Sequence, residues 1–259
     1  GNDPLKAYGK TTDLTAMGGA QYVHTFDKCF FMPSDLTAGL EYNRDRLKDN
    51  MWGYNRHTDQ TVNIYSAFLQ NEWKNDRWGI LIGGRLDKHN MVDNVIFSPR
   101  ANLRFNPTQN INLRLSYSSG FRAPQAFDED MHIENVGGTV AMIERAKDLK
   151  EEKSQSFSVS ADMYHRFGAF QTNLLIEGFY TRLTDVFVLG KPYDRGDGIL
   201  VKTRSNGPGA KVMGLTLEGK VAYLSILQIQ AGLTLQRSRY DEPHKWHDDA
   251  PAEKKIFRT

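Results

Sequence analysis

The chain has 259 residues, with 33 basic and 31 acidic side chains that leave a formal net charge of +2. Both signs are mixed along the chain, which excludes the one-sided basic surface of a nucleic-acid-binding protein, and no stretch approaches the roughly 20 apolar residues of a membrane-spanning helix. Apolar residues make up 39% and aromatic residues 11%, with 22 glycines, a composition that favours alternating β-strands over a compact helical core.

Alternation of apolar and polar residues with a period of two predicts the strands. In chain order, about ten are expected, at roughly 16–26, 35–46, 61–74, 77–88, 96–106, 110–119, 154–166, 170–182, 213–223 and 227–235. In 110–119, for example, Ile111 and Leu113 lie on one face, whereas Asn112 and Arg114 lie on the other. A helix would place residues i and i+2 on opposite sides, so the pattern predicts an all-β fold.

The connections between these strands alternate in length. Short ones follow Phe26, Trp73, Asn106, His165 and Tyr223, where Asn, Asp, Gly and Pro favour tight reversals. Long polar ones are expected at about 44–60, 88–95, 119–153, 183–211 and from 237 onward. This alternation gathers the short turns at one rim and the long loops at the other, as in outer-membrane barrels. We therefore predict an antiparallel up-and-down meander that is part of a large transmembrane β-barrel.

Aromatic residues lie near the expected strand ends, where a barrel would place its interfacial girdles. They are Tyr42, Trp73, Trp78, Phe105, Tyr117, Phe170, Tyr180 and Tyr223. In a soluble β-sandwich the same residues would pack in the core. A soluble or surface β-rich module that binds a glycan or mediates adhesion therefore stays as the alternative, and a passive porin is a closer one.

A resemblance to a known family rests on a motif at the end of the sixth strand. Gly120-Phe121-Arg122-Ala123-Pro124 resembles the segment in which a strand of TonB-dependent receptor barrels ends. Further segments that resemble the family occur in its order, at 67–73, 82–89, 98–104, 112–117, 150–154 and 214–218. The resemblance covers about residues 16–259 and implies a barrel of 22 strands.

This resemblance implies an outer-membrane receptor of a Gram-negative bacterium that takes up a scarce nutrient of the iron-siderophore, cobalamin, haem or glycan type. The ligand would be a small molecule or a metal chelate, and a TonB-type inner-membrane complex would supply energy through a plug domain. We interpret 1–259 as a partial barrel domain without the plug, the TonB-contacting box and the closing strand. Outer-membrane lipid is an expected partner, and open strand edges predict self-association of the isolated chain.

Two sets of residues are functional candidates, one for the lumen of a barrel and one for ligand contacts. Arg100, Arg104 and Arg114 share the polar face of adjacent strands, with Arg85 as a possible fourth, and would line the lumen of a barrel. The loops 119–153 and 183–211 are candidate binding loops, because long loops on a rigid scaffold often carry function. Their candidate ligand-binding residues are Arg122, Tyr193, Arg195, Asp197 and Asn206.

No catalytic constellation or cofactor site is apparent, so the chain is not expected to be an enzyme. His244, His247, Asp248 and Asp249 have a spacing compatible with metal ligands, but a solvated loop is the simpler interpretation. The acidic run from Asp128 to Glu134 lacks the spacing of an EF-hand. The sequence therefore predicts no metal site, and a β-rich hydrolase would need a carboxylate pair or a nucleophile in a cleft.

Overall fold

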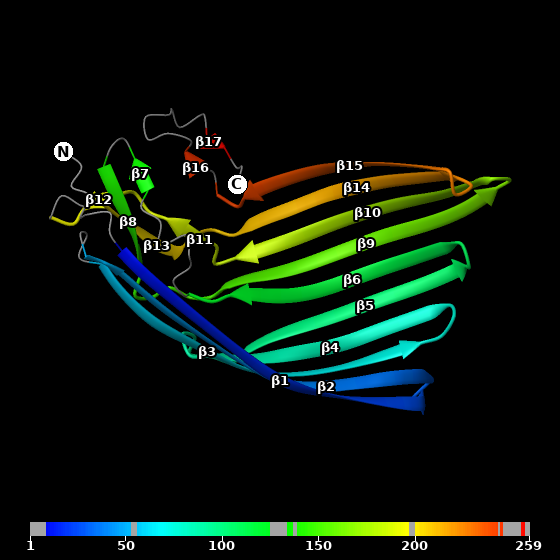
Figure 1. Ribbon diagram of the computed structural model, residues 1–259, viewed down its shortest axis with the longest axis horizontal. Coiled ribbons are helices and arrows are strands. Elements are labelled where there is room, and N and C mark those ends of the chain that lie inside the picture. Colours follow the sequence, from blue (N-terminus) through cyan, green and yellow to red (C-terminus); the bar gives the residue numbers. More distant parts are fainter. Residues whose placement is uncertain are drawn as a thin grey trace.

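The computed structural model describes residues 9–52, 56–124, 134–136, 139–196, 200–242, 244–245 and 255–256. Within these residues, ten strands form one antiparallel sheet in which each strand pairs with the next along the meander. They are β1 (Gly9–Cys29), β2 (Met32–Met51), β3 (Arg56–Lys74), β4 (Trp78–His89), β5 (Ile96–Thr108), β6 (Ile111–Arg122), β9 (Glu152–Phe167), β10 (Phe170–Thr184), β14 (Ala210–Tyr223) and β15 (Leu227–Tyr240). The predicted all-β meander is confirmed, and the sheet is curved and open (Figure 1).

The prediction of a long loop at 44–60 was wrong. β2 and β3 continue to Met51 and Arg56, which pair with each other at the far end of this hairpin. Both faces of the extension carry polar residues, so the apolar–polar alternation that marks the rest of the sheet is lost there, although the backbone ladder continues. β1, β2 and β3 therefore reach far beyond β4 at the long-loop end (Figure 1).

The loops predicted at 119–153 and 183–211 contain short strands of their own. These are β7 (Glu134–Val136), β8 (Thr139–Arg145), β11 (Phe187–Leu189), β12 (Tyr193–Asp194) and β13 (Leu200–Asn206). They form a second, small sheet, called the loop sheet below, in which β8 and β13 pair in parallel. It lies at the long-loop end of the main sheet (Figure 1). β16 (His244–Lys245) and β17 (Lys255–Ile256) pair separately.

The main sheet has one apolar face and one polar face. A row of apolar residues crosses from β5 to β15 through paired positions: Leu103, Leu115, Val159, Gly178, Leu215 and Leu235. The five side chains in this row are 37–60% exposed. A row of paired positions on the other face contains Arg100, Ser118, Ser156 and Thr181. A sheet whose whole apolar face remains uncovered needs a non-aqueous environment against it.

Aromatic pairs border this apolar face at both ends of the strands. At the short-turn end, Trp78 stacks on Phe105 with ring centroids 4.3 Å apart. At the other end, Tyr42 and Tyr65 lie 4.9 Å apart. On β3, Trp73 lies eight positions after Tyr65, which is about 26 Å along the strand and about 20 Å across a membrane at the usual tilt. The spacing is close to the height of the apolar band of a membrane barrel.

The buried side chains gather at the long-loop end rather than under the main sheet. A small cluster at the long-loop ends of β4 to β6 consists of Val92, Ile96 and Ala123, packed against Phe121. Leu47 and Val62 on the β2–β3 extension, together with Met142 and Val201 of the loop sheet, are also almost fully buried. The hydrogen bond from Arg145 of the loop sheet to Gln60 on β3 ties the loop sheet to this rim of the main sheet. The described residues include no helix long and apolar enough to cross a membrane.

The polar face depends on close cross-strand packing at Gly39, where an added Cβ would lie 2.2 Å from the ring of Phe68. We expect Gly39→Ala to lower the free energy of unfolding by about 1–3 kcal/mol, because the ring must leave its position. Urea unfolding of the protein in detergent micelles measures this change.

The matched control is Gly219→Ala in β14, where an added Cβ meets nothing within 4 Å. This control should be as stable as the wild type or slightly more stable, since alanine restricts the unfolded chain. Equal stability of the two variants would contradict the packing described for Gly39.

Candidate ligand-binding mouth

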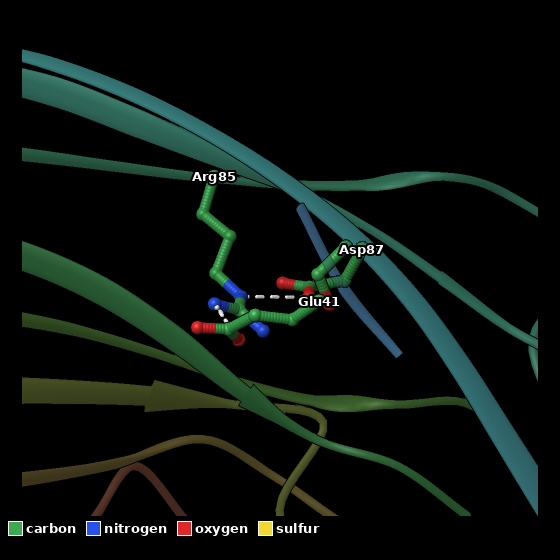
Figure 2. A network of polar contacts seen from close by, with 4 residues as sticks. Glu41, Arg85 and Asp87 are labelled. Atoms are coloured by element: carbon green, nitrogen blue, oxygen red, sulfur yellow. Dashed lines mark hydrogen bonds and ion pairs between the residues drawn. The ribbon is translucent and has the colours of Figure 1, made fainter. Parts of the chain in front are cut away.

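Three charged side chains meet on the polar face of β2 and β4 and point toward one another (Figure 2). The Arg85 guanidinium contacts Glu41 with 2.6 Å between Nη1 and Oε2, and contacts Asp87 with 2.8 Å between Nε and Oδ1. Ser66, between them on β3, donates its hydroxyl to Asp87 Oδ1 over 2.6 Å. The register creates this site, because Glu41, Ser66 and Asp87 are direct neighbours across β2, β3 and β4.

Burial differs strongly within this network. The side chain of Asp87 is 4% exposed, whereas Arg85 and Glu41 are 37% and 39% exposed. The buried carboxylate is held by one cationic and one hydroxyl donor, which a buried charge requires. Arg85 and Glu41 keep polar atoms accessible to whatever occupies the space in front of the polar face.

Two adjoining recesses open in front of this network. One has a volume of about 470 Å³ and spans β1 to β6, and the other has a volume of about 440 Å³ and reaches toward Phe121. Both are lined by Glu41, Arg85, Ser98 and Ser119. This lining offers cationic, anionic and hydroxyl groups side by side, which suits recognition of a polar ligand or a polar protein segment by hydrogen bonds.

The predicted arginines lie at different distances from the short turns on the polar face. Arg100 lines the larger recess together with Arg85. Arg104 and Arg114 are paired positions on β5 and β6, nearer the short turns. Arg104 donates to the backbone carbonyl of Asn75 over 3.1 Å, so it also holds a turn. The structure therefore brings Arg100 and Arg85 together at one recess and separates them from the other two.

The loop sheet joins the two predicted binding loops into one unit. Asn206 at the end of β13 accepts a hydrogen bond from the backbone N–H of Lys150 over 2.8 Å, and donates to the carbonyls of Lys150 and Asp185. The backbone N–H of Phe187 donates to Glu152 over 2.8 Å. These bonds connect residues that are up to 56 positions apart, which no local sequence pattern indicates.

The predicted loop residues have unequal positions in this unit. Tyr193 in β12 is 48% exposed. Arg195 lies 3.9 Å from the carboxylate of Glu144, measured from Nη1 to Oε1. Arg122 ends β6 with its guanidinium over the ring of Phe187, 5.6 Å from the ring centre. Asp197 lies outside the residues that the structure describes.

The loop sheet also contacts the β2–β3 extension. Arg145 of β8 donates to the side-chain oxygen of Gln60 on β3 over 2.9 Å and to the carbonyl of Pro124 over 3.0 Å. Neither this pair nor Glu41 and Asp87 had been predicted from the sequence. Alternation alone could have assigned Glu41 and Asp87 to the polar face, but finding the contact between Arg145 and Gln60 needs the three-dimensional arrangement.

A half-buried ion pair at the same rim joins β10 to the residue that follows β15. Arg182 donates to both carboxylate oxygens of Asp241, with both nitrogen–oxygen distances at 2.5 Å. Hydrogen bonds from Arg182 hold the pKa of the Asp241 carboxyl below its ordinary value. A carboxyl with a lowered pKa adds stability at neutral pH, and this contribution is lost as the pH falls through the lowered pKa.

The groups at this site are suited to binding a polar ligand by hydrogen bonds. Within the described part of the chain, no group of three His, Cys, Asp or Glu side chains is placed to hold a metal ion. Of the metal candidates weighed from the sequence, His247, Asp248 and Asp249 lie outside that part, and His244 is described only in its backbone. What the structure does bring together is a charged polar recess on the main sheet and, at the long-loop end, a unit of interlinked loops (Figure 1).

Comparison with known proteins supports the predicted barrel fold. A family model described as TonB dependent receptor-like, beta-barrel, matches residues 2–256. The chain is 23% identical over 206 residues to the probable hemoglobin and hemoglobin-haptoglobin-binding protein 3 of Haemophilus influenzae, a match that covers 78% of this chain and 18% of that protein.

Solved structures share the fold at low identity. The siderophore receptor PirA from Pseudomonas aeruginosa has a TM-score of 0.75 and 17% identity, over 91% of this chain and 44% of that one. The FrpB iron transporter from Neisseria meningitidis (F5-1 variant) has a TM-score of 0.66 and 16% identity, over 92% of this chain and 38% of that one. The chain thus spans less than half the length of these relatives.

Replacing Arg85 tests whether its guanidinium stabilises the buried Asp87 carboxylate. We expect Arg85→Met to lower the free energy of unfolding by about 2 kcal/mol, because a buried carboxylate loses its charged partner while the arginine itself is partly solvated. Urea unfolding in micelles measures the effect. The double variant Arg85→Met/Asp87→Asn should recover part of the loss, and a loss equal to the sum of the two single variants would contradict the pairing.

Asn206 should hold both binding loops at once. We expect Asn206→Ala to accelerate hydrogen exchange of the amides around Lys150 and Phe187 by about tenfold or more, since three hydrogen bonds of about 1 kcal/mol each are lost. Mass spectrometry of peptides from both loops measures the rates. Tyr193→Ala is the control and should leave them unchanged. Acceleration confined to one loop would show that the loops are independent.

Proposed function

Since the chain belongs to the family of TonB-dependent receptor-like β-barrels, we propose that it forms part of the barrel wall of an outer-membrane receptor that takes up a scarce nutrient. The observation that carries this proposal is the two-faced sheet. Its apolar face is exposed between two rows of aromatic residues, and its polar face holds charged recesses below the loop sheet. Proteins of this family are receptors and transporters located in the outer membrane of Gram-negative bacteria.

Iron in a chelated form is the ligand class that we favour. The two structural relatives are named a siderophore receptor and an iron transporter, and the Haemophilus relative is named for binding haemoglobin. Cobalamin and glycans were open from the sequence, but neither ligand appears in the names of these three relatives. Ferric siderophores and haem both present carboxylate or other oxygen atoms, which arginine and tyrosine can bind by hydrogen bonds.

Within this receptor, the loop residues take two roles. Tyr193 in β12 is 48% exposed, and the side chain of Arg195, two residues later, is 30% exposed; these two are the proposed ligand contacts. Asn206 and Arg122 keep the loops in place through the bonds to Lys150 and the contact with Phe187. Arg85 and Arg100 on the polar face would meet the ligand after it has passed the loops, or would meet the plug. Movement of a plug by a TonB-type complex would supply the energy.

The alternative of a soluble β-rich module is disfavoured by the same sheet. A soluble sandwich buries apolar faces against each other, whereas Val159, Leu215 and Leu235 remain 59%, 42% and 60% exposed. A water-exposed surface of this extent would aggregate, while in a bilayer it faces the acyl chains. The lateral pairing of the strands satisfies the backbone polar groups, as a membrane requires.

Growth of the source bacterium under iron limitation tests the proposal. We expect deletion of the gene to abolish growth on one iron source in a panel of ferric siderophores, haem and haemoglobin, and the wild-type gene to restore it. Tyr193→Ala should lower uptake of that source several-fold without reducing the amount of receptor in the outer membrane. Unchanged growth on every iron source would contradict the iron proposal, and growth loss on cobalamin or a glycan would reassign the ligand.

A further inference from the structure

In the extension of β2, the basic side chains lie on one face of the strand. Residues 44–49 read Arg-Asp-Arg-Leu-Lys-Asp, and the strand turns alternate residues to opposite sides. Arg44, Arg46 and Lys48 continue the apolar face and are exposed, whereas Leu47 and Asp49 lie on the other side and are 4% and 2% exposed. The three cations, called the basic strip below, therefore point away from the polar face and its recesses.

The basic strip keeps a positive charge after its internal pairing. Arg46 and Lys48 share a single carboxylate, Asp59 on β3, at 3.6 Å and 3.3 Å. Arg44 makes no ion pair with any residue that the structure describes, and Lys10 on the neighbouring β1 extends the same side. Three cations against one anion leave a net charge of +2, and the side chains of Arg46 and Lys48 remain 43% and 46% exposed.

The strip begins where the apolar face ends. Arg44 is two residues beyond Tyr42, which pairs with Tyr65 in the aromatic row at the long-loop end. Lys48 is six residues beyond it, so the strip covers about 7–20 Å along the strand past the tyrosines. Aromatic girdles lie at the level of the lipid headgroups, and long loops lie outside the cell. The strip is therefore at the height of the headgroups of the outer leaflet.

We propose that the basic strip binds the phosphate groups of anionic lipid headgroups in the outer leaflet of the outer membrane. The proposal rests on the orientation given by the proposed function, but not on the identity of the nutrient. Arginine presents a planar fork of donors that fits phosphate oxygens, and lysine adds a mobile point charge. Tyr42 and Tyr65 below the strip supply hydroxyls and ring faces at the same interface.

Lipid fits this surface better than an acidic protein does. The strip follows directly on the exposed Leu40, and a recess of about 480 Å³, lined by Leu40, Leu86 and Lys88 among others, opens on the same face. A ligand that covers the strip therefore also meets acyl-chain-sized apolar surface immediately below it. A phosphorylated headgroup attached to acyl chains has both parts in this order, whereas an acidic protein surface would leave the apolar part exposed to water or lipid.

The test uses the complete native protein in uncharged detergent micelles and two probes, diphosphorylated lipid A and its dephosphorylated form. We expect the triple variant Arg44→Gln/Arg46→Gln/Lys48→Gln to bind the phosphorylated probe about a hundredfold more weakly than the wild type, or about fivefold for each charge removed. Binding should weaken as salt is added. The dephosphorylated probe should bind both proteins equally weakly.

A matched control neutralises three exposed cations at the opposite rim, in Lys28→Gln/Arg77→Gln/Arg166→Gln, and should bind like the wild type. Asp59→Asn removes the anion of the strip and should tighten binding severalfold, which keeps the proposal testable if the triple variant fails to fold. Equal loss in both triple variants, or equal binding of the two probes, would overturn the proposal. So would normal lipid binding by the strip variant together with loss of an acidic protein partner. Iron-source uptake, measured separately, distinguishes failure of this proposal from failure of the receptor function.

Discussion

Lateral pairing of the backbone is the constraint on which the rest of this structure depends. A strand that crosses a membrane must satisfy its N–H and C=O groups on neighbouring strands, because the bilayer core offers no water. Ten strands of the described chain do this in one continuous antiparallel ladder. Once the ladder is fixed, side chains alternate between two environments, so every second residue is available for lipid and the others for a polar interior. The charged recesses on one face and the apolar belt on the other both follow from this alternation of side chains.

The same ladder explains why the buried apolar side chains of the described residues lie at the long-loop end. Side chains of the membrane-crossing part meet lipid or the interior, and few become buried within the sheet. Beyond the aromatic row, the long β2–β3 hairpin is hydrogen-bonded to the loop sheet, and buried residues such as Leu47, Val62, Met142 and Val201 occur in these two parts. The strands of the main sheet thus carry a second sheet built from two loops. Hydrogen bonds of Asn206 connect the two loops, and the hydrogen bond of Arg145 to Gln60 connects the loop sheet to β3.

The sequence predicted the sheet well because its signal is local. The alternation of residues such as Ile111, Asn112 and Leu113 needs only the period of a strand, and turns were visible in short polar segments. The prediction failed at 44–60, where β2 and β3 continue with polar residues on both faces and alternation of hydrophobicity carries no information. The loop sheet was not foreseen either, because its parallel pairing of β8 with β13 joins segments about sixty residues apart.

Candidate site residues divide in the same way. The polar parity of Arg85 and Arg100 was readable along single strands, whereas their meeting at one recess depends on register across β2 to β6. Asn206 was selected as a flexible loop donor, but its hydrogen bonds to Lys150 and Asp185 hold the loops together. Composition could not distinguish a ligand contact from a structural one, since both use the same amide chemistry.

The most direct test of a two-faced membrane sheet is the accessibility of alternate positions on adjacent strands of the native protein in a bilayer. Spin labels placed singly at Leu115, Ser116, Ser158 and Val159 would be exposed to oxygen dissolved in lipid and to a water-soluble nickel complex. Labels at Leu115 and Val159 should respond to oxygen, while labels at Ser116 and Ser158 should respond to nickel. Labels that all respond to nickel, or that show no alternation, would contradict a membrane-spanning sheet with one lipid face.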